Sequence, residues 1–394
     1  MVSTDNNHSG PFAVALDLPS PGLPKEARVV VAMSGGVDSS VVAWMLAQSG
    51  HASVGLFMRN GVEVDAAEVA KKSCCSVGDA RDARMISARL ELPFQAVDLA
   101  PEFSTIIDYF VSEYRRGRTP NPCAVCNRDL KFDALLRFAQ EFGAEYVATG
   151  HYARLERPDN SVDGRVWVRR GVDPRKDQSY QLFCVREENL ARTVLPLGGL
   201  HKPEVRQLAE RMGLRTAKKP DSQEICFVPS NDYRRLLKER GVRLTPGKLV
   251  DTTGRVLGDH PGIEHFTIGQ RRGLGVAAGV PMFVVDIVPS TATVVVGIRE
   301  ECSSSALITE ELNLIGFDPP ENGAFRADVQ VRYHHDAAPA SVEMDRESGT
   351  ARIVFDDPQH AVAPGQGAAL YQGDRMIGGG WIASTEPLAM HHEA

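Results

Sequence analysis

The chain has 394 residues, 43% of them hydrophobic and 24% charged, which is typical of a globular protein of two or three domains. No apolar stretch approaches the roughly 18 consecutive residues of a membrane-spanning helix, so the sequence predicts no membrane association. The formal net charge of −7 excludes a uniformly basic surface, and a nucleic-acid partner would therefore need a local basic patch.

The beginning of the chain differs in composition from the rest. Residues 1–25 are rich in Ser, Pro and Asn and lack the basic start of a signal peptide, which predicts a disordered leader. The seven cysteines are too few and too scattered for a disulfide scaffold. Their odd number and the adjacent pair Cys74 and Cys75 suit a reducing, cytoplasmic compartment, where thiols serve catalysis or metal binding.

Between residues 26 and 218, β-rich apolar runs alternate with helical patterns. Strands are predicted at 29–33, 53–58, 94–99 and 146–149, and helices at 41–48, 80–90, 103–115 and 132–142. Such alternation indicates βαβ units, and hence an α/β fold with a parallel sheet that helices cover on both faces.

The helical periodicity ends at about residue 246, and short β-branched runs separated by turns follow. These runs lie at 282–288, 293–296, 327–332, 351–355 and 368–371. They predict a C-terminal β-barrel over 287–388, which a small central domain over 219–286 connects to the α/β domain.

A local excess of positive charge lies around the junction of these domains. Residues 201–243 contain eleven basic and six acidic residues, among them Arg206, Lys218, Arg234 and Arg235. A polyanion would bind such a patch, and a solvated helix face is the alternative interpretation.

The most specific local pattern lies directly between the first predicted strand and its helix. Residues 34–40 read Ser-Gly-Gly-Val-Asp-Ser-Ser, and the two glycines allow a tight turn whose N–H groups point into one concavity at a helix start. Such a site binds phosphate, with Asp38 as a candidate Mg²⁺ ligand. The lysine of a Walker A loop is missing, so the sequence predicts a nucleotide site of another type. A capped glycine turn with no ligand is the alternative.

This loop resembles the SGGxDS loop of the PP-loop ATP pyrophosphatases, whose domain is of the adenine nucleotide alpha hydrolase type. The resemblance implies that ATP is cleaved between its α and β phosphates, which releases pyrophosphate and leaves an adenylated acceptor. Several enzymes with different acceptors share this loop, so the residues downstream must distinguish among them.

Four motifs follow the loop, namely TPNPCAVCN at 119–127, ATGHY at 148–152, KDQSY at 176–180 and DSQEICF at 221–227. Together with FTIGQR at 266–271, RY at 332–333 and PGQ at 364–366, they resemble the tRNA-specific 2-thiouridylase family over about residues 28–388. The resemblance implies an ATP-dependent tRNA-uridine 2-sulfurtransferase. Such an enzyme adenylates the C2 oxygen of the wobble uridine in the anticodon stem-loop of Lys, Glu and Gln tRNAs. It then replaces that oxygen by sulfur and releases AMP.

The exchange of a carbonyl oxygen for sulfur has two chemical requirements. Adenylation turns the oxygen into a leaving group, and a cysteine persulfide delivers sulfur in protected form. One thiol then carries the terminal sulfur, and a second attacks the carrier and frees that sulfur, which leaves a disulfide. By resemblance, Cys226 bears the persulfide and Cys126 attacks it. A cysteine desulfurase or a sulfur-relay protein would be the donor, and we expect Cys184 and Cys302 to be buried and inert.

Cys123 departs from the family pattern, because many members carry Asp at this position. Cys123, Cys126 and Cys226 form a three-thiolate set that also suits a 4Fe–4S cluster with one open iron, as related tRNA thiolases use. Structural zinc would need a fourth ligand. Persulfide and cluster chemistry both remain open at this point. The prolines of 119–127 predict a rigid, non-helical segment that presents two thiols ahead of the next helix.

The remaining site residues are implied by resemblance. The ATP site comprises Ala32, Met33, Ser34, Gly35, Gly36, Val37, Asp38, Ser39, Met58 and Gly150, with Met58 packing on the adenine. The tRNA site comprises Asn121, Pro122, Cys123, His151, Lys176, Asp177, Gln178, Arg332, Tyr333 and Gln366. The target base must leave the stacked anticodon loop before its C2 atom can be attacked, and 121–123 would surround it. Taken singly, most of these residues also fit structural roles.

Two other functions compete with this interpretation. One is a different PP-loop enzyme, a lysidine or amide synthetase, which needs no paired cysteines. The other is a non-catalytic RNA-binding or redox-sensing protein in which Cys123 and Cys126 bind a metal. Pyrophosphate formation with and without unmodified tRNA discriminates between these classes.

Overall fold

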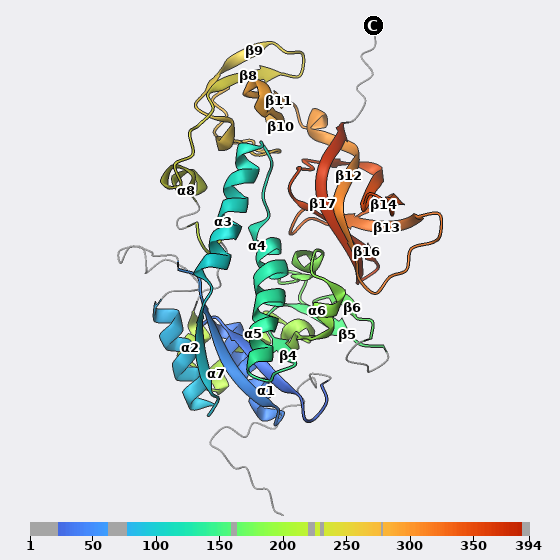
Figure 1. Ribbon diagram of the computed structural model, residues 1–394. Coiled ribbons are helices and arrows are strands. Elements are labelled where there is room, and N and C mark those ends of the chain that lie inside the picture. Colours follow the sequence, from blue (N-terminus) through green and yellow to red (C-terminus); the bar gives the residue numbers. More distant parts are fainter. Residues whose placement is uncertain are drawn as a thin grey trace, which may run out of the picture.

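The computed structural model describes residues 23–61, 77–158, 164–219, 225–228, 232–276 and 279–387. The chain forms an α/β domain at one end, a small β domain at the other end, and a barrel beside them (Figure 1). Residues 1–22 of the predicted leader and the pair Cys74 and Cys75 lie outside the described residues. No helix in the described part is both long and apolar enough to cross a membrane.

The α/β domain is built on a five-stranded parallel sheet with the strand order β3-β2-β1-β4-β7. Its strands are β1 (Arg28–Met33), β2 (Ala52–Arg59), β3 (Phe94–Asp98), β4 (Tyr146–Ala148) and β7 (Thr193–Val194). The sheet confirms the predicted α/β fold and adds β7, which is too short for a sequence pattern. Because the strand order reverses at β1, a ligand crevice is expected at the carboxyl ends of β1 and β4.

Helices cover both faces of the sheet because successive residues of β1 point to opposite sides. Val29 and Val31 share one core with α1 (Val37–Gln48), α2 (Val77–Arg89) and α7 (Lys202–Arg211). Val30 and Ala32 belong to another core with α5 (Leu135–Glu141). The other helices of the α-type are α3 (Ala100–Arg115), α4 (Pro122–Val125), α6 (Glu187–Ala191) and α8 (Tyr233–Glu239).

The prediction of a non-helical segment at 119–127 is wrong. A helix begins at Pro122 as α4 and continues as a π-helix, η1 (Cys126–Ala134), into α5. Proline is tolerated at the first helical position, and Asn121 caps this helix because its side-chain oxygen accepts a bond from Ala124 N at 3.2 Å. The Cys126 residue therefore lies at the start of a wide π-helical turn, a feature that is frequent at functional sites.

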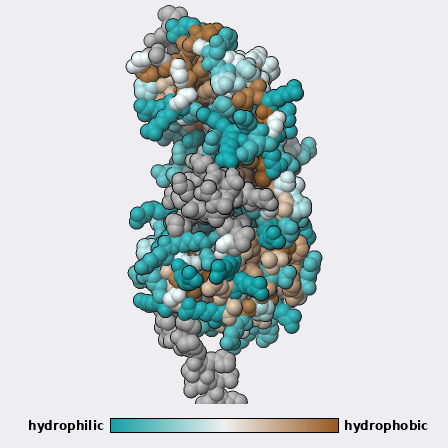
Figure 2. Space-filling model, turned by 90° about the vertical axis from the view of Figure 1, so that its left-hand side faces the viewer, coloured by the Kyte–Doolittle hydropathy of each residue, from teal (hydrophilic) through white to brown (hydrophobic). Residues whose placement is uncertain are grey.

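The small β domain contains a four-stranded sheet in the order β10-β11-β8-β9. Its strands are β8 (Gly247–Asp251), β9 (Val256–His260), β10 (Phe283–Val288) and β11 (Thr293–Gly297). The predicted boundary between residues 286 and 287 falls inside β10, and β11 pairs with β8, so both strands belong to this sheet. In Figure 2 the brown, hydrophobic surface gathers mainly at this end of a largely hydrophilic face.

The predicted C-terminal barrel is confirmed as six antiparallel strands closed by the pairing of β12 with β17. Its strands are β12 (Ser303–Leu314), β13 (Ala324–Gln330), β14 (Ala338–Asp345), β15 (Thr350–His360), β16 (Gly367–Gln372) and β17 (Arg375–Pro387). A hairpin of β5 (Ala153–Glu156) and β6 (Trp167–Arg170) from the middle of the chain extends this sheet through β17. The barrel is therefore hydrogen-bonded to the α/β domain, which sequence periodicity did not indicate.

Candidate functional site

The 34–40 loop forms a tight turn between β1 and α1. Ser34 N donates to Ser39 Oγ at 3.1 Å, and Ser40 Oγ donates to Gly36 O at 2.5 Å. Gly35 has a φ of +68°, and a Cβ atom there would lie 2.3 Å from Asp79 O at the start of α2. The loop is therefore compact and requires glycine at position 35, and it places the N-terminus of α1 at the carboxyl end of β1.

The carboxylate of Asp38 is held by a lysine that the sequence analysis did not single out. Lys202 Nζ lies 2.7 Å and 2.8 Å from the two Asp38 oxygens, and Tyr152 OH donates to Asp38 Oδ1 at 2.8 Å. Lys202 is the first residue of α7, which begins with a capping box between His201 and Glu204. That capping signal is visible in the sequence, but only the packing of α7 against α1 brings the ammonium group to Asp38.

Carboxylate oxygens are suitable Mg²⁺ ligands, but both oxygens of Asp38 already contact Lys202. In this arrangement the lysine balances the charge of the carboxylate, and the role of Asp38 as a Mg²⁺ ligand stays a prediction. A second lysine also reaches the loop. Lys219 Nζ donates to Gly35 O at 3.0 Å and contacts Asp79 Oδ1 at 2.5 Å.

The other predicted nucleotide contacts lie at the same edge of the sheet. Gly150 follows β4, and a Cβ atom there would lie 3.0 Å from Asp38 Cβ and 3.2 Å from Ser39 N. Met58 is half-buried near the end of β2, the strand next to β1. The structure thus brings the 34–40 loop, Met58 and Gly150 together at the carboxyl ends of three adjacent strands.

His151 lies inside the protein and connects β4 to the π-helix. Thr149 Oγ1 lies 2.7 Å from His151 Nδ1, and Asn127 Oδ1 lies 3.2 Å from His151 Nε2. Burial lowers the pKa of His151 well below its usual range, and the nearby Lys131 lowers it further. The imidazole is therefore neutral at physiological pH, and its contacts link the nucleotide side of the site to the segment that carries Cys126.

The two cysteines with predicted sulfur chemistry pack against one hydrophobic core. Cys126 and Cys226 are both half-buried at the edge of the cluster that contains Phe103, Phe110 and Phe227. The Phe227 ring meets Phe103 and Phe110 edge-on, with centroid distances of 5.6 Å and 5.3 Å. Phe227 thus anchors the residue next to Cys226 at the core that also borders Cys126.

Cys123 is exposed, unlike the other two. Among the residues that the structure describes, which include all three cysteines, no three His, Cys, Asp or Glu side chains are grouped as a metal site. The ligand set of an iron–sulfur cluster is therefore not assembled here. The predicted burial of Cys184 and Cys302 is confirmed, and this burial raises their thiol pKa values, that of Cys184 to about 12.

Several residues of the predicted tRNA site make internal contacts. Asp177 accepts bonds from Gly171 N at 2.9 Å and Ser179 Oγ at 2.9 Å, and Gln178 Oε1 accepts one from Tyr152 N at 3.0 Å. These two side chains hold the backbone around them in place. Lys176 beside them is half-buried.

The other predicted tRNA residues lie where the barrel meets the 119–127 segment. Gln366 Nε2 donates to Thr119 O at 3.1 Å and to Pro120 O at 3.0 Å, directly ahead of Asn121. Asn121 and Pro122 are buried, whereas Tyr333 is half-buried. Burial, followed by the neighbouring Asp177 and Cys123, raises the pKa of Tyr333 to about 12.

A cavity of ≈ 750 Å³ opens beside this junction. It is lined by Thr119, Asp232, Tyr233, Arg234, Thr267, Ile268, Gly269, Gln270, Arg332 and Gln366. Residues from all three domains and from α8 therefore surround it. Arg332 Nη2 donates to Ala361 O at 2.9 Å, which orients this cation at the barrel wall.

The basic window is only partly available to a ligand. Arg206 is half-buried and donates to Ala217 O at 2.8 Å and Lys219 O at 3.1 Å. Arg234 and Arg235 on α8 are exposed, and Arg235 pairs with Glu239 at 2.8 Å within the same helix. The exposed members of the window, which include Lys218, Arg234 and Arg235, are the ones that fit a surface that contacts phosphates.

Comparison with known protein families divides the chain in the same order as the structure. Residues 27–230 match the tRNA methyl transferase HUP domain, 234–298 the tRNA methyl transferase PRC-barrel domain, and 304–382 the aminomethyltransferase beta-barrel domain. Among solved structures, the U34-tRNA thiolase NcsA from Methanococcus maripaludis with its 4Fe-4S cluster is 19% identical. It covers 57% of this chain and 69% of its own, and its TM-score of 0.35 supports no inference about this chain.

Curated relatives match at much higher identity and over nearly their full length. The tRNA-specific 2-thiouridylase MnmA of Carboxydothermus hydrogenoformans is 48% identical over 361 residues, covering 90% of this chain and 97% of that protein. The enzyme of the same name from Geobacter metallireducens is 47% identical over 366 residues, covering 91% and 98%. With three family models matched in order and such relatives over about nine-tenths of the chain, this protein belongs to the tRNA-specific 2-thiouridylase family.

Proposed function

We propose that this protein is an ATP-dependent tRNA 2-thiouridylase that acts on the wobble uridine of Lys, Glu and Gln tRNAs. The observation that carries this proposal is the combination of a phosphate-binding loop with two half-buried cysteines that border one core. A lysidine or amide synthetase would need the loop but not the two thiols. Membership in the 2-thiouridylase family supports the same choice.

In the first half-reaction, the uridine O2 atom attacks the α-phosphorus of ATP, and pyrophosphate leaves. The N-terminus of α1 and the backbone of the 34–40 loop would bind the phosphates, with Met58 and Gly150 beside the nucleoside. Mg²⁺ would accompany the ATP phosphates. Lys202 and Lys219, which contact the loop and its aspartate, are suited to balance the charge of pyrophosphate.

In the second half-reaction, sulfur replaces the activated oxygen. The Cys126 thiolate attacks the inner sulfur of a Cys226 persulfide, which forms a disulfide and frees hydrosulfide. Hydrosulfide adds to the adenylated C2 atom, AMP leaves with the former O2 atom, and one proton is released. The two thiols are oxidised as the terminal sulfur is reduced, so an external thiol must reduce the disulfide before the next turnover.

A persulfide-carrying protein, such as a cysteine desulfurase or a sulfur-relay protein, would load Cys226. Persulfide chemistry needs only the half-buried thiols of Cys126 and Cys226, whereas a cluster would also need the thiol of the exposed Cys123. The residues of the predicted tRNA site would then surround the flipped base and the neighbouring backbone. The cavity bordered by Arg234 and Arg332 offers space beside them.

The chain would then consist of a PP-loop catalytic domain over 26–218, a central connecting domain and a C-terminal barrel, behind a leader over 1–25. We propose to move the boundary between the last two domains from 286 to the interval between β11 and β12, since β10 and β11 pair with β8 and with each other. A cytoplasmic location follows from a tRNA substrate and a need for reduced thiols.

The decisive experiment uses the anaerobically purified protein, ATP, a persulfide donor and unmodified tRNA. Expected are pyrophosphate, released only in the presence of tRNA, and 2-thiouridine, detected by mass spectrometry of digested tRNA. Pyrophosphate release without thiolation by any donor would point to a different PP-loop enzyme. No pyrophosphate release would point to a non-catalytic RNA-binding protein.

The variant Cys123→Asp separates the two sulfur mechanisms. In the persulfide mechanism this change introduces the residue that many family members carry, and much of the activity should remain. In the cluster mechanism it removes a ligand, so iron and activity should be lost together. Iron and sulfide analysis of both proteins makes the comparison direct.

A further inference from the structure

Two consecutive glutamates of the barrel contact the two ends of the segment that carries Cys126. Arg118 Nη2 lies 2.8 Å from Glu310 Oε1, and Arg128 Nη1 lies 3.1 Å from Glu311 Oε2. The two arginines bracket the segment from Thr119 to Asn127. The cysteine segment is therefore attached to strand β12 on both sides of its thiols.

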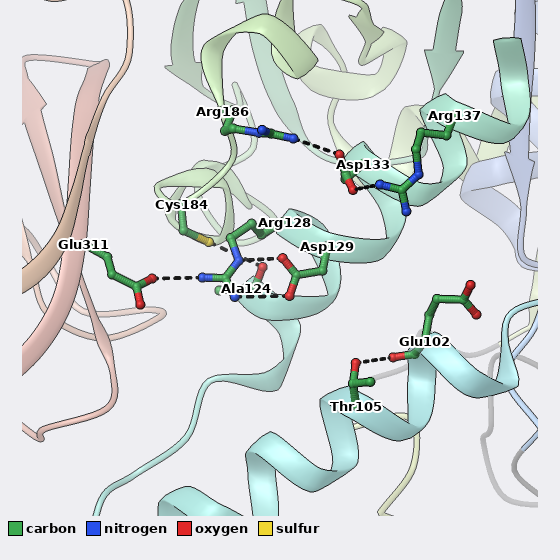
Figure 3. Close-up of polar contacts among 10 residues, drawn as sticks. All are labelled: Glu102, Thr105, Ala124, Arg128, Asp129, Asp133, Arg137, Cys184, Arg186 and Glu311. Carbon is green, nitrogen blue, oxygen red and sulfur yellow. Dashed lines mark hydrogen bonds and ion pairs between the residues drawn. The ribbon is translucent and has the colours of Figure 1, made fainter.

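A regular strand could not make these two contacts, because consecutive side chains of a strand point to opposite faces. Strand β12 is irregular here, since its register with β17 shifts between Glu310 and Asn313. Glu311 has a φ of 51°, a left-handed conformation that is uncommon for a residue with a side chain. Such a bulge redirects side chains, and in Figure 3 Glu311 extends from the barrel to Arg128.

The Arg128 side chain is oriented before any ligand binds. Its Nε and Nη2 atoms donate to Asp129 Oδ1 at 2.6 Å and Oδ2 at 3.1 Å, as Figure 3 shows. Its guanidinium carbon lies 6.0 Å from the centre of the Trp381 ring on β17. The neighbouring carboxylates raise the pKa of Arg128 above its already high range. This cation is therefore permanently charged and aimed at Glu311.

Arg118 is held in place in the same way at the other end of the cysteine segment. Its Nε atom lies 2.7 Å from Glu113 Oε2 of α3, a carboxylate whose side chain is 6% exposed. Its Nη2 atom also donates to Ile382 O of β17 at 3.4 Å. Arg118 thus connects a buried acid of the α/β domain to the barrel.

These contacts are poorly suited to stabilise the whole fold. The Glu311 side chain is 68% exposed and that of Glu310 is 45% exposed, and exposed ion pairs contribute little to folding stability. Positioning has a much steeper effect, because a misplacement of about 1 Å in a reacting group costs about 10²-fold in rate. The contacts of Glu310 and Glu311 are therefore better explained by the positioning of the cysteine segment than by a contribution to the stability of the whole fold.

We propose that the Glu310–Glu311 bulge of the barrel positions Cys126 for sulfur transfer, with Arg118 and Arg128 as positioning residues. This inference rests on the proposed function and deepens it. The arginines touch no reacting atom; they hold both ends of the cysteine segment against the docked barrel. The Cys126 thiol is thereby held at a constant position relative to Cys226 and the 34–40 loop. The barrel thus affects the rate of sulfur transfer through the position of Cys126.

A charge-exchange experiment tests this proposal. Arg128→Glu and Glu311→Arg are each expected to slow single-turnover thiolation at least about 10-fold, while pyrophosphate release with tRNA stays within about twofold. The double variant restores an ion pair in the opposite sense and should recover thiolation to within about threefold. The matched control is Arg137→Glu, since Arg137 pairs with Asp133 in the same helical segment and not with the barrel (Figure 3).

A second measurement follows Cys126 itself. In the Cys123→Ser, Cys226→Ser background, the rate of Cys126 alkylation by iodoacetamide should change with Arg128→Glu and Glu311→Arg and return in the double variant. Thermal unfolding midpoints of all variants should agree within a few degrees. The proposal is overturned if the single variants thiolate normally, if the double variant is no better than the worse single variant, or if pyrophosphate release falls in parallel. A wild-type protein that forms no 2-thiouridine would instead contradict the proposed function.

Discussion

The ammonium group of Lys202 lies 2.7 Å and 2.8 Å from the two carboxylate oxygens of Asp38, beside the turn that is expected to bind ATP. The Lys202 side chain is only 9% exposed, and the Tyr152 hydroxyl contacts the same carboxylate. Asp38 would otherwise repel a triphosphate that enters the loop. The lysine therefore makes an acidic loop compatible with a polyanionic substrate.

Lys202→Met should lower tRNA-dependent pyrophosphate release by about 10²-fold, because a charge-balancing donor at the phosphates is lost. Lys202→Arg should retain part of the rate. The control is Lys218→Met, which removes an exposed lysine of the same window. If Lys202→Met and Lys218→Met release pyrophosphate equally fast, the role of Lys202 at the phosphates is refuted.

Cys126→Ser and Cys226→Ser should each abolish 2-thiouridine formation while pyrophosphate release continues, because adenylation precedes the attack by sulfur. Cys302→Ala serves as the control, since this thiol is buried, has a raised pKa and is expected to take no part in the chemistry. Thiolation is measured by mass spectrometry of digested tRNA. Normal thiolation by both serine variants would show that the sulfur site lies elsewhere.

The two adjacent glycines of the 34–40 loop should respond differently to substitution. In Gly35→Ala the new Cβ atom would lie 2.3 Å from Asp79 O at a φ of +68°, so we expect a loss of about 1–3 kcal/mol in the free energy of unfolding and no pyrophosphate release. In Gly36→Ala the new Cβ atom would meet Ser34 Oγ at 3.3 Å, and φ is −92°. Urea titrations should show the larger destabilisation for Gly35→Ala, and equal effects would contradict the loop geometry.

His151 should make stability depend on pH below neutrality. Its pKa is depressed in the folded state by burial, so the unfolded chain binds the proton more readily below about pH 6.5. The stability that the neutral ring contributes is present above that pH and is lost as the pH falls toward the depressed folded pKa. In urea titrations between pH 5 and 7.5, His151→Gln should reduce the slope of the unfolding free energy against pH by up to about 1.4 kcal/mol per pH unit. An unchanged slope would show that His151 is not buried in its neutral form.

The α8 end of the basic window should govern the electrostatics of tRNA binding. Arg234→Ala and Arg235→Ala should each reduce the salt slope of tRNA binding by about one unit if the side chain contacts a phosphate. Arg206→Ala should instead lower the unfolding midpoint and leave the salt slope unchanged, because Arg206 donates to the carbonyls of Ala217 and Lys219. Fluorescence titrations with tRNA at several salt concentrations measure the salt slopes, and thermal unfolding measures the midpoint. Unchanged slopes for Arg234 and Arg235 would assign the window to a solvated surface.

Most strands of the parallel sheet could be predicted from the sequence, because strands that are buried on both faces appear as continuous apolar runs. The position of the 34–40 loop at a helix start could also be predicted, because its glycine and serine residues lie directly between a predicted strand and a predicted helix. The burial of Cys184 followed from the high burial of free cysteine in general. These features depend on residues that are close together in the chain.

The helix at Pro122 was missed because proline is read as a helix breaker, whereas a cap by Asn121 and a first-turn position make it a helix starter. The boundary at 286 was misplaced because sequence periodicity does not say which strands pair. Both errors concern contacts that a local pattern leaves undetermined.

The sequence by itself determined the chemical inventory of this protein, namely a glycine- and serine-rich loop at a helix start and cysteines in two separate motifs. Only the tertiary structure decided which charged groups meet them. Lys202 contacts Asp38, and Glu310 and Glu311 contact Arg118 and Arg128, across sequence separations of 164 to 192 residues. The physical reason is that ion pairs follow from the packing of helix on helix and barrel on helix, and this packing depends on the shape of the whole core rather than on local periodicity.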